Sequence, residues 1–204
     1  MTFTARRHLT VFAGLVALTL SMSALLATPF FTMHGVANAQ SARAWQALAR
    51  GEAVAIVRHA KAPHARGRRR SRGPKLVNLM DCGSQRNLSA AGRAQARRIG
   101  AALRRRGVAN AQVISSYYCR TMETARLLGF GWVSWDYDLN ALSRPTARQQ
   151  TAGLRALVRG APRGRPRILV THKTNIRALT GVTPKSGETL IVSRTGKVIG
   201  RLRM

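Results

Sequence analysis

Three segments of strand length and mostly apolar character recur along the chain, at residues 53–57, 112–116 and 167–171. Between and after them, apolar residues recur every three or four positions, which indicates amphipathic helices. Strands that alternate with helices build a mainly parallel sheet with helices on both faces. The pattern therefore predicts a three-layer α/β fold.

Capping and turn residues mark where the other elements begin and end. Helices are expected at residues 41–51, between Ser89 and Gly107, and at residues 121–128, 146–158 and 175–179. A period of two over residues 132–139 predicts an edge or half-buried strand. Residues 188–193 and 197–202 flank a glycine-containing turn, which is typical of a β-hairpin.

The N-terminal apolar stretch, from residue 9 to about residue 33, is much longer than these segments. It follows two arginines and precedes Ala-Asn-Ala at residues 37–39, the small residues that a signal peptidase requires. We expect residues 1–39 to be a signal peptide and residues 40–204 to be a single domain that is periplasmic or secreted. An uncleaved membrane anchor is the alternative.

Arginine dominates the charge of the chain. There are 35 basic and 6 acidic residues, which gives a net charge of +29, and removal of the two arginines in residues 1–39 lowers it to +27. Such a field attracts phosphorylated small molecules or the phosphates of a cell envelope. Nucleic acid is not expected, because the sequence shows neither aromatic stacking platforms nor a recognition element. The five arginines in residues 66–72 predict a solvated loop, either a collar for an anionic substrate or a disordered insertion.

Cys82 and Cys119 are the only cysteines. In an oxidising compartment they can form a disulfide, and two free, half-buried thiols are the alternative. Cysteine and histidine do not show the spacing of metal ligands, so we expect neither a metal nor another cofactor.

The predicted strands end in residues that suit an anion site. Arg58-His59 follows the first strand, Arg120 comes shortly after the second, and His172 follows the third. In open α/β sheets, ligands bind at the carboxyl edge of the strands. We therefore expect these four side chains to converge at that edge.

Two arginines and two histidines suit a phosphoryl group. Each guanidinium can hold two phosphate oxygens in its planar fork. A histidine is largely neutral at pH 7, so its ring nitrogen can attack phosphorus without a separate base. His59 is the expected nucleophile, and His172 is expected to donate to the oxygens that gain charge during transfer.

Four short motifs follow one another in an order that is more specific than any one of them. They are Arg58-His59-Ala60, Leu88-Ser89 with Gly92, Gln95 and Ala96, Ser115-Ser116 with Arg120 and Glu123-Thr124-Ala125, and His172. In this order they resemble the histidine phosphatase superfamily. The resemblance covers about residues 53–194 and implies a phosphoglycerate-mutase-like fold.

This resemblance also implies a mechanism, in which His59 is phosphorylated on a ring nitrogen and water hydrolyses the intermediate. Arg58, Arg120 and His172 fall on the phosphate-pocket positions of the family. Arg86 and Asn175 are further candidates for substrate binding. The alternatives are turn hydrogen bonds for Arg86 and a capping or orienting role for Asn175.

The leaving group needs a proton, and the sequence departs from the family at the positions of the acid. Residues 172–175 resemble the His-Asp-Thr-Asn segment of the acid phosphatase and phytase branch, but Lys173 replaces the aspartate. The mutase branch carries Leu-Asn-Glu where this chain has Leu-Asn-Ala at residues 139–141. The acid of neither branch is therefore present.

Among the remaining carboxylates, Glu188 is the preferred general acid because it precedes a strand that follows the second histidine. Asp81 and Asp138 are the alternatives. Glu123 lies one turn after Arg120 and is expected to brace an arginine, so a simple ion pair with Glu123 is the alternative to a phosphate role for Arg120.

These observations predict an exported, metal-independent histidine phosphatase that hydrolyses a phosphomonoester or a related phosphoryl compound through a phosphohistidine on His59. Two alternatives are a phosphomutase and a catalytically weak envelope protein that binds phosphate or an acidic polymer. The substrate cannot be named from the sequence.

Overall fold

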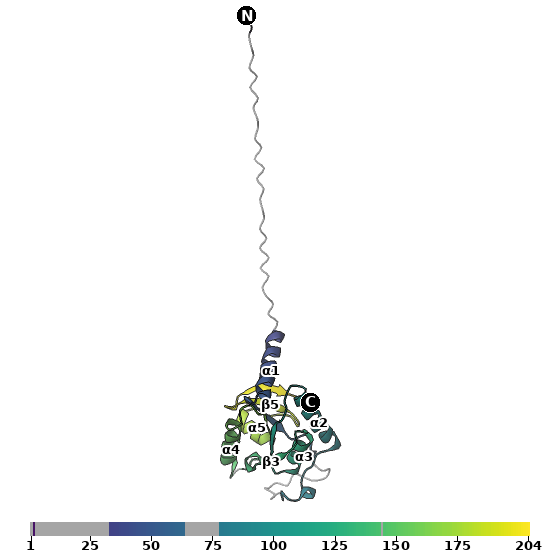
Figure 1. Ribbon diagram of the computed structural model, residues 1–204. Coiled ribbons are helices and arrows are strands. Elements are labelled where there is room, and N and C mark those ends of the chain that lie inside the picture. The colour runs from purple at the N-terminus through teal and green to yellow at the C-terminus, as the bar shows by residue number, and fades with distance from the viewer. Residues whose placement is uncertain (1, 3–32, 64–77, 144) are drawn as a thin grey trace. The chain divides into compact units, whose positions relative to one another are not determined.

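The computed structural model describes residue 2 and residues 33–63, 78–143 and 145–204, with residues 33–40 described by their backbone alone (Figure 1). Most of the predicted signal peptide and the arginine-rich run at residues 66–72 lie outside the described residues. Within the described ranges, no helix has both the length and the apolar character needed to cross a membrane.

Six strands of the described residues form one sheet in the order β3-β2-β4-β1-β5-β6. Their bounds are β1 (Ala53–Arg58), β2 (Gln112–Ser115), β3 (Val133–Trp135), β4 (Arg167–Thr171), β5 (Thr189–Ser193) and β6 (Val198–Leu202). Strands β3, β2, β4 and β1 run parallel to one another, whereas β5 is antiparallel to β1 and β6 to β5. The prediction of a mainly parallel sheet is therefore confirmed, and the predicted hairpin forms its edge.

Five α-helices and two short 3-10 helices occur in the described part of the chain. They are α1 (Met33–Ala49), η1 (Cys82–Ser84), α2 (Ala90–Arg104), α3 (Cys119–Leu127), η2 (Tyr137–Leu139), α4 (Ala147–Arg159) and α5 (Lys173–Thr180). Helix α1 begins before the predicted residue 41, so the expected cleavage site at residues 37–39 is helical. Cleavage there stays a prediction.

The predicted strand at residues 132–139 is wrong in its second half. Strand β3 ends at Trp135, because the side chain of Asp136 accepts a hydrogen bond from the amide of Asp138 (2.8 Å) and starts η2. An aspartate that bonds an amide two residues on favours a turn over a strand. Asn140 follows η2 directly, and its side chain reaches Ser116 and Tyr117 at the end of β2.

The sheet separates two hydrophobic layers, and the alternation along β1 shows why. Ala55 and Val57 face α1, α2 and α3, whereas Val54 and Ile56 face α4 and α5. In Figure 1, α4 and α5 lie on one side of the sheet, and α2 and α3 on the other. The prediction of helices on both faces is therefore confirmed.

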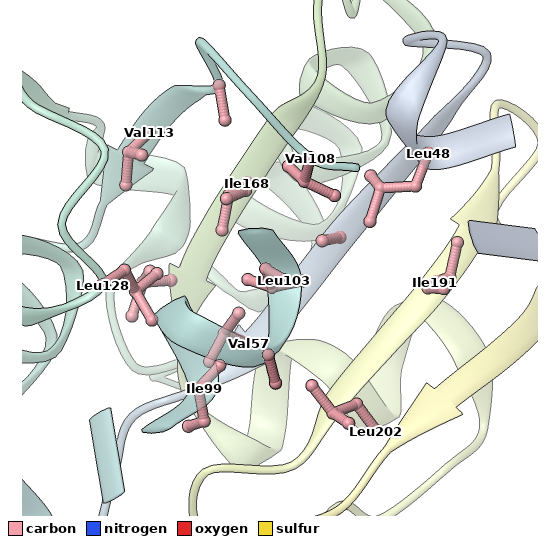
Figure 2. Close-up of a cluster of buried hydrophobic side chains, with 14 of the residues drawn as sticks. Leu48, Val57, Ile99, Leu103, Val108, Val113, Leu128, Ile168, Ile191 and Leu202 are labelled. Atoms are coloured by element: carbon pink, nitrogen blue, oxygen red, sulfur yellow. The ribbon is translucent and has the colours of Figure 1, made fainter. Parts of the chain in front are cut away.

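The first of these layers is formed by side chains that interlock between helices and strands. Ile99 and Leu103 of α2 pack toward Val57 of β1 and Ile168 of β4 (Figure 2). All four side chains are fully buried, and burial of each stabilises the fold by roughly 1.5–3 kcal/mol. This packing holds the strands in register where they deliver the polar residues at their carboxyl ends.

Candidate active site

The two predicted histidines leave the sheet at the same edge. Strands β1 and β4 are parallel neighbours with Arg58 opposite Thr171, so His59 and His172 follow them side by side. The amide of His59 donates to the carbonyl of Thr171 (3.0 Å). The two imidazole centroids lie 5.5 Å apart, and the residues are only 5% and 4% exposed. The structure thus brings together the rings that we expected to share one phosphoryl group.

The hydrogen bonds of His59 select one tautomer. Its Nδ1 lies 2.8 Å from the carbonyl oxygen of Ala60. A carbonyl can only accept, so Nδ1 carries the proton and Nε2 keeps its lone pair. The amide of Ala60 donates to Oγ1 of Thr124 on α3 (3.0 Å), which anchors the carbonyl. His59 therefore presents an Nε2 lone pair whose orientation is set by the backbone.

The hydrogen bonds of His172 also select one tautomer, through Ser116. The hydroxyl of Ser116 lies 3.0 Å from Oδ1 of Asn140, which also accepts from the amide of Tyr117 (2.9 Å). The hydroxyl must donate to this oxygen, so its own oxygen accepts from Nε2–H of His172 (2.9 Å). On the other side of the ring, Nη2 of Arg120 donates to Nδ1 of His172 (3.1 Å). Both ring nitrogens of His172 are therefore engaged.

This arrangement differs from the expected role of His172. A neutral His172 with these partners has no free N–H for a phosphate oxygen. Instead, it holds the guanidinium of Arg120 in place. The sequence could indicate that His172 lies at the edge of the sheet, but not which atoms occupy its ring nitrogens.

Both histidines are neutral at pH 7. Burial lowers the pKa of His59 to about 3, with a further contribution from the nearby arginines, and the carbonyl of Ala60 opposes the shift only in part. Burial also lowers the pKa of His172 well below 6.5, and the charge of Arg120 acts in the same direction. His59 thus keeps its lone pair throughout the neutral range.

Three arginines, which we call the arginine cluster, surround the histidines: Arg58, Arg86 and Arg120. Arg58 donates to the carbonyl of Pro184 (2.8 Å), and Arg86 donates to the carbonyl of Ala62. The Nε atom of each of the three is buried and has no hydrogen-bond partner. A buried charged donor without an acceptor costs more than the roughly 1–3 kcal/mol of a neutral one. An anion bound at the arginine cluster would reduce this cost.

Mutual repulsion shows that the three charges lie near one another. Burial lowers the pKa of Arg58 and Arg86, and the charge of Arg86 lowers that of Arg58 further. Burial, together with repulsion from Arg86, lowers the pKa of Arg120 to about 10, so it stays protonated at neutral pH. Within the described part of the chain, no carboxylate forms an ion pair with the arginine cluster. The geometry is that of a site for a multiply charged oxyanion.

Comparison with known families agrees with this geometry. Residues 54–140 match the family model described as the histidine phosphatase superfamily (branch 1). Over these residues the match confirms the resemblance predicted from the motifs, and the superfamily comprises hydrolases and mutases that act on phosphoryl groups.

Solved structures with the same fold include two proteins named SixA. A protein from Agrobacterium tumefaciens, described as the phosphohistidine phosphatase SixA, is 17% identical over 76% of this chain and 99% of its own, with a TM-score of 0.51. The protein histidine phosphatase SixA in complex with tungstate is 18% identical over 74% of this chain and 96% of its own, with a TM-score of 0.50. The predicted phosphoglycerate-mutase-like fold is confirmed. No curated protein matches the sequence significantly.

The motif of Ser89, Gly92 and Gln95 at the start of α2 binds the segment that follows His59. The Oγ atom of Ser89 accepts from the amide of Gly92 (3.1 Å), and the amide of Ser89 donates to the carbonyl of Lys61 (3.1 Å). A Cβ atom at Gly92 would lie 2.1 Å from that carbonyl oxygen, so only glycine allows this approach. Gln95 completes the contact, with Oε1 accepting from the amide of Lys61 (3.1 Å).

Asn175 binds the backbone instead of the site. It is fully buried, and its amide nitrogen donates to the carbonyls of Asn140 (2.8 Å) and Asp138 (3.2 Å). We therefore correct its predicted substrate-binding role: Asn175 positions the loop whose Asn140 side chain orients Ser116. Ser116 and Asn140 were not predicted as site residues, although Ser116 belongs to a quoted motif.

Glu188 is a structural carboxylate and not the expected general acid. It is 2% exposed and accepts hydrogen bonds from the amide of Lys185 (2.8 Å) and from Nε of Arg203 (3.0 Å). Burial alone would raise its pKa, but the Lys185 amide and the charges of Arg203 and Arg201 hold the pKa below its usual value. Glu188 is therefore ionised at neutral pH and has no proton to donate.

The other carboxylates are engaged elsewhere. All six acidic residues of the chain lie within the described ranges. Their partners are Arg50 for Glu52, Arg93 for Glu123, the amide of Gly83 for Asp81 and the amide of Asp138 for Asp136. The carboxylate of Asp138 packs against Gly153 of α4, where a Cβ atom would lie 1.7 Å from it. No hydrogen bond or ion pair joins any of the six to the histidines or to the arginine cluster.

The partner of Glu123 also decides between the two expectations for Arg120. Glu123 lies 3.5 Å from Arg93, whereas Arg120 contacts His172 and stacks over the ring of Tyr118 at 4.4 Å. Glu123 thus braces an arginine, as predicted, but not Arg120. The guanidinium of Arg120 is left without a counterion.

A disulfide joins the two segments that carry Arg86 and Arg120. Cys82 and Cys119 are bonded, with their Cα atoms 5.7 Å apart, which resolves the alternative left open by the sequence. The amide of Cys119 also donates to Oε1 of Gln85 (3.1 Å). The disulfide thereby fixes the loop before α2 to the first turn of α3.

Proposed function

We propose that this chain is an exported, metal-independent phosphatase that acts through a phosphohistidine on Nε2 of His59. The observation that carries the proposal is the free Nε2 lone pair of a buried, neutral His59 next to three arginines that lack counterions. The match of residues 54–140 to the histidine phosphatase superfamily supports the same chemistry.

The first step transfers the phosphoryl group. The Nε2 lone pair attacks phosphorus, the bond from phosphorus to the leaving oxygen breaks, and that oxygen takes its proton from solvent. The arginine cluster balances the charge on the three non-bridging oxygens. The positive charge that develops on the imidazole is stabilised by the hydrogen bond from Nδ1–H to the carbonyl of Ala60 (2.8 Å).

The second step releases phosphate. A water molecule attacks phosphorus and releases a proton to solvent, the P–N bond breaks, and Nε2 recovers its lone pair. The net reaction consumes one ester and one water and yields an alcohol and inorganic phosphate. The charge supplied by three guanidinium groups makes a metal unnecessary for either step.

The experiment that tests this mechanism is hydrolysis of an aryl phosphate in the presence of a chelator. We expect activity from the wild-type protein and none from His59→Ala. Brief reaction with ³²P-labelled substrate should leave an acid-labile, base-stable label on the wild-type protein. Activity retained by His59→Ala, or a label on another residue type, would contradict the mechanism.

A catalytically weak binder of phosphate or of an acidic envelope polymer is the second candidate. It is favoured by the lack of a carboxylic acid at the site and by the net charge of +29. The same assay separates the two, because the binder predicts phosphate binding without turnover in the wild-type protein. A phosphomutase predicts transfer of the label to a second substrate instead of its release as phosphate.

Export is supported by the Cys82–Cys119 disulfide, because disulfides persist mainly in oxidising compartments. We propose a periplasmic or secreted location after cleavage behind residue 39. Mass spectrometry of the protein purified from the producing cell should show Gln40 at the N-terminus. An intact N-terminus in the membrane fraction would instead indicate the uncleaved anchor.

A further inference from the structure

A cavity of about 780 Å³ adjoins the arginine cluster but shares none of its residues. Its walls include Met80, Tyr117, Met122, Trp135 and the Cys82–Cys119 disulfide, together with the charged residues Glu123 and Arg126. A volume of this size accommodates a ring system and its substituents. Nothing in the mechanism above uses this cavity.

Residues that line the cavity directly precede or follow residues of the phosphate site at three places in the chain. Arg86 is followed by Asn87, which lines the cavity. Ser116 is followed by the lining residue Tyr117, and Arg120 is preceded by Cys119. Consecutive Cα atoms are only about 3.8 Å apart. A substrate whose phosphoryl group sits in the arginine cluster can therefore extend into the cavity.

The walls of the cavity suit an aromatic ring. The rings of Tyr117 and Trp135 meet edge to face with centroids 6.1 Å apart, and Met122 lines the cavity from α3. Aromatic and methionine side chains contact aromatic rings favourably. Trp135 is 49% exposed and Met80 is 91% exposed, which is unusual for apolar side chains grouped on so charged a protein.

The leaving group supplies an independent argument. No hydrogen bond or ion pair joins any of the six carboxylates to the histidines or to the arginine cluster, and Glu123, which lines the cavity, is paired with Arg93. The departing oxygen therefore leaves without a proton from a protein acid. A phenol has a pKa near 10, about six units below that of water, and its oxyanion is a correspondingly better leaving group than an alkoxide. A site without a general acid therefore favours aryl esters over alkyl esters.

We propose that this cavity binds the aromatic leaving group of a small aryl phosphate ester, while the arginine cluster holds its phosphoryl group. The proposal rests on the proposed function. It assigns the substrate class through two observations that do not depend on each other: the mainly apolar cavity with its aromatic side chains, and the lack of a carboxylate bonded to the histidines or to the arginine cluster.

The test compares 2-naphthyl phosphate, which carries a ring, with acetyl phosphate, which has a good leaving group and no ring. Trp135→Ala should lower kcat/KM for 2-naphthyl phosphate at least tenfold, chiefly through KM, and change that for acetyl phosphate less than twofold. Trp135→Phe should restore most of the loss. Trp132→Ala is the matched control, because Trp132 is 81% exposed and does not line the cavity.

The outcomes separate this proposal from the proposed function. If Trp135→Ala lowers kcat/KM equally for both substrates, or for neither, the aromatic subsite is wrong while phosphatase activity stands. If the wild-type protein hydrolyses neither substrate, the proposed function fails first. Should Trp135→Ala not fold, Met122→Ala carries the same comparison, with an expected loss of at least threefold on 2-naphthyl phosphate alone.

Discussion

Arginines at the carboxyl edge of the sheet and arginines elsewhere on the surface have opposite surroundings. Arg50 and Arg203 have side chains that are 58% and 62% exposed, and each pairs with a glutamate. Arg58, Arg86 and Arg120 have a buried Nε atom without a partner and no carboxylate beside them. The net charge of the chain is therefore a poor guide to function. What identifies the anion site is charge that is buried and uncompensated.

The largest expected effect is the loss of catalysis when one member of the arginine cluster is removed. Arg120→Ala should lower kcat/KM for an aryl phosphate roughly 10²–10³-fold, because a donor aimed at the charge of the transition state contributes about that much. Arg50→Ala, the surface control, should leave kcat/KM unchanged. Equal effects of the two substitutions would erase the distinction between the two kinds of arginine.

The next effect is stabilisation by inorganic phosphate. A ligand present at about 100 times its Kd stabilises the folded state by about 2.7 kcal/mol. Thermal unfolding of the wild-type protein should therefore shift upward by several degrees on addition of phosphate. Arg86→Ala should lose most of this shift, and Arg203→Ala should keep it. Loss of the shift in both variants would mean that phosphate binds the general surface charge.

The smallest effect is the pH dependence of stability. The pKa of His59 is near 6.5 in the unfolded chain and about 3 in the folded protein. Between these values the unfolded chain binds more protons, so stability falls as the pH is lowered from about 6.5. The fall reaches at most about 1.4 kcal/mol per pH unit for each buried histidine.

Denaturant titrations between pH 6.5 and 5 measure this slope. The slope should be smaller in His59→Gln than in the wild-type protein. The surface ion pairs contribute little to the change in stability between pH 6.5 and 5, because an arginine–glutamate pair titrates mainly outside this range. A slope that is the same in both proteins would show that His59 is not held neutral by burial.

Two site residues show where prediction from sequence ends. Glu188 was expected to be the general acid because of its place in the chain, but the side chain of Arg203 and the Lys185 amide keep it ionised. Asn175 was expected near substrate, but its amide binds the backbone of residues 138 and 140. In both cases the position of the residue in the chain suited the expected role, but the direction of its side chain gave it another role.

The sequence by itself determined the order of strands and helices, the two histidines at strand ends and the motif that α2 uses to hold the loop after His59. These features are local, because periodicity, capping and close approach at glycine depend on neighbouring residues. Only the tertiary structure decided the tautomers of His59 and His172, the place of Arg86 in the arginine cluster, the disulfide and the aromatic cavity. Each of these depends on which atoms from distant segments meet, and on the water that their meeting excludes.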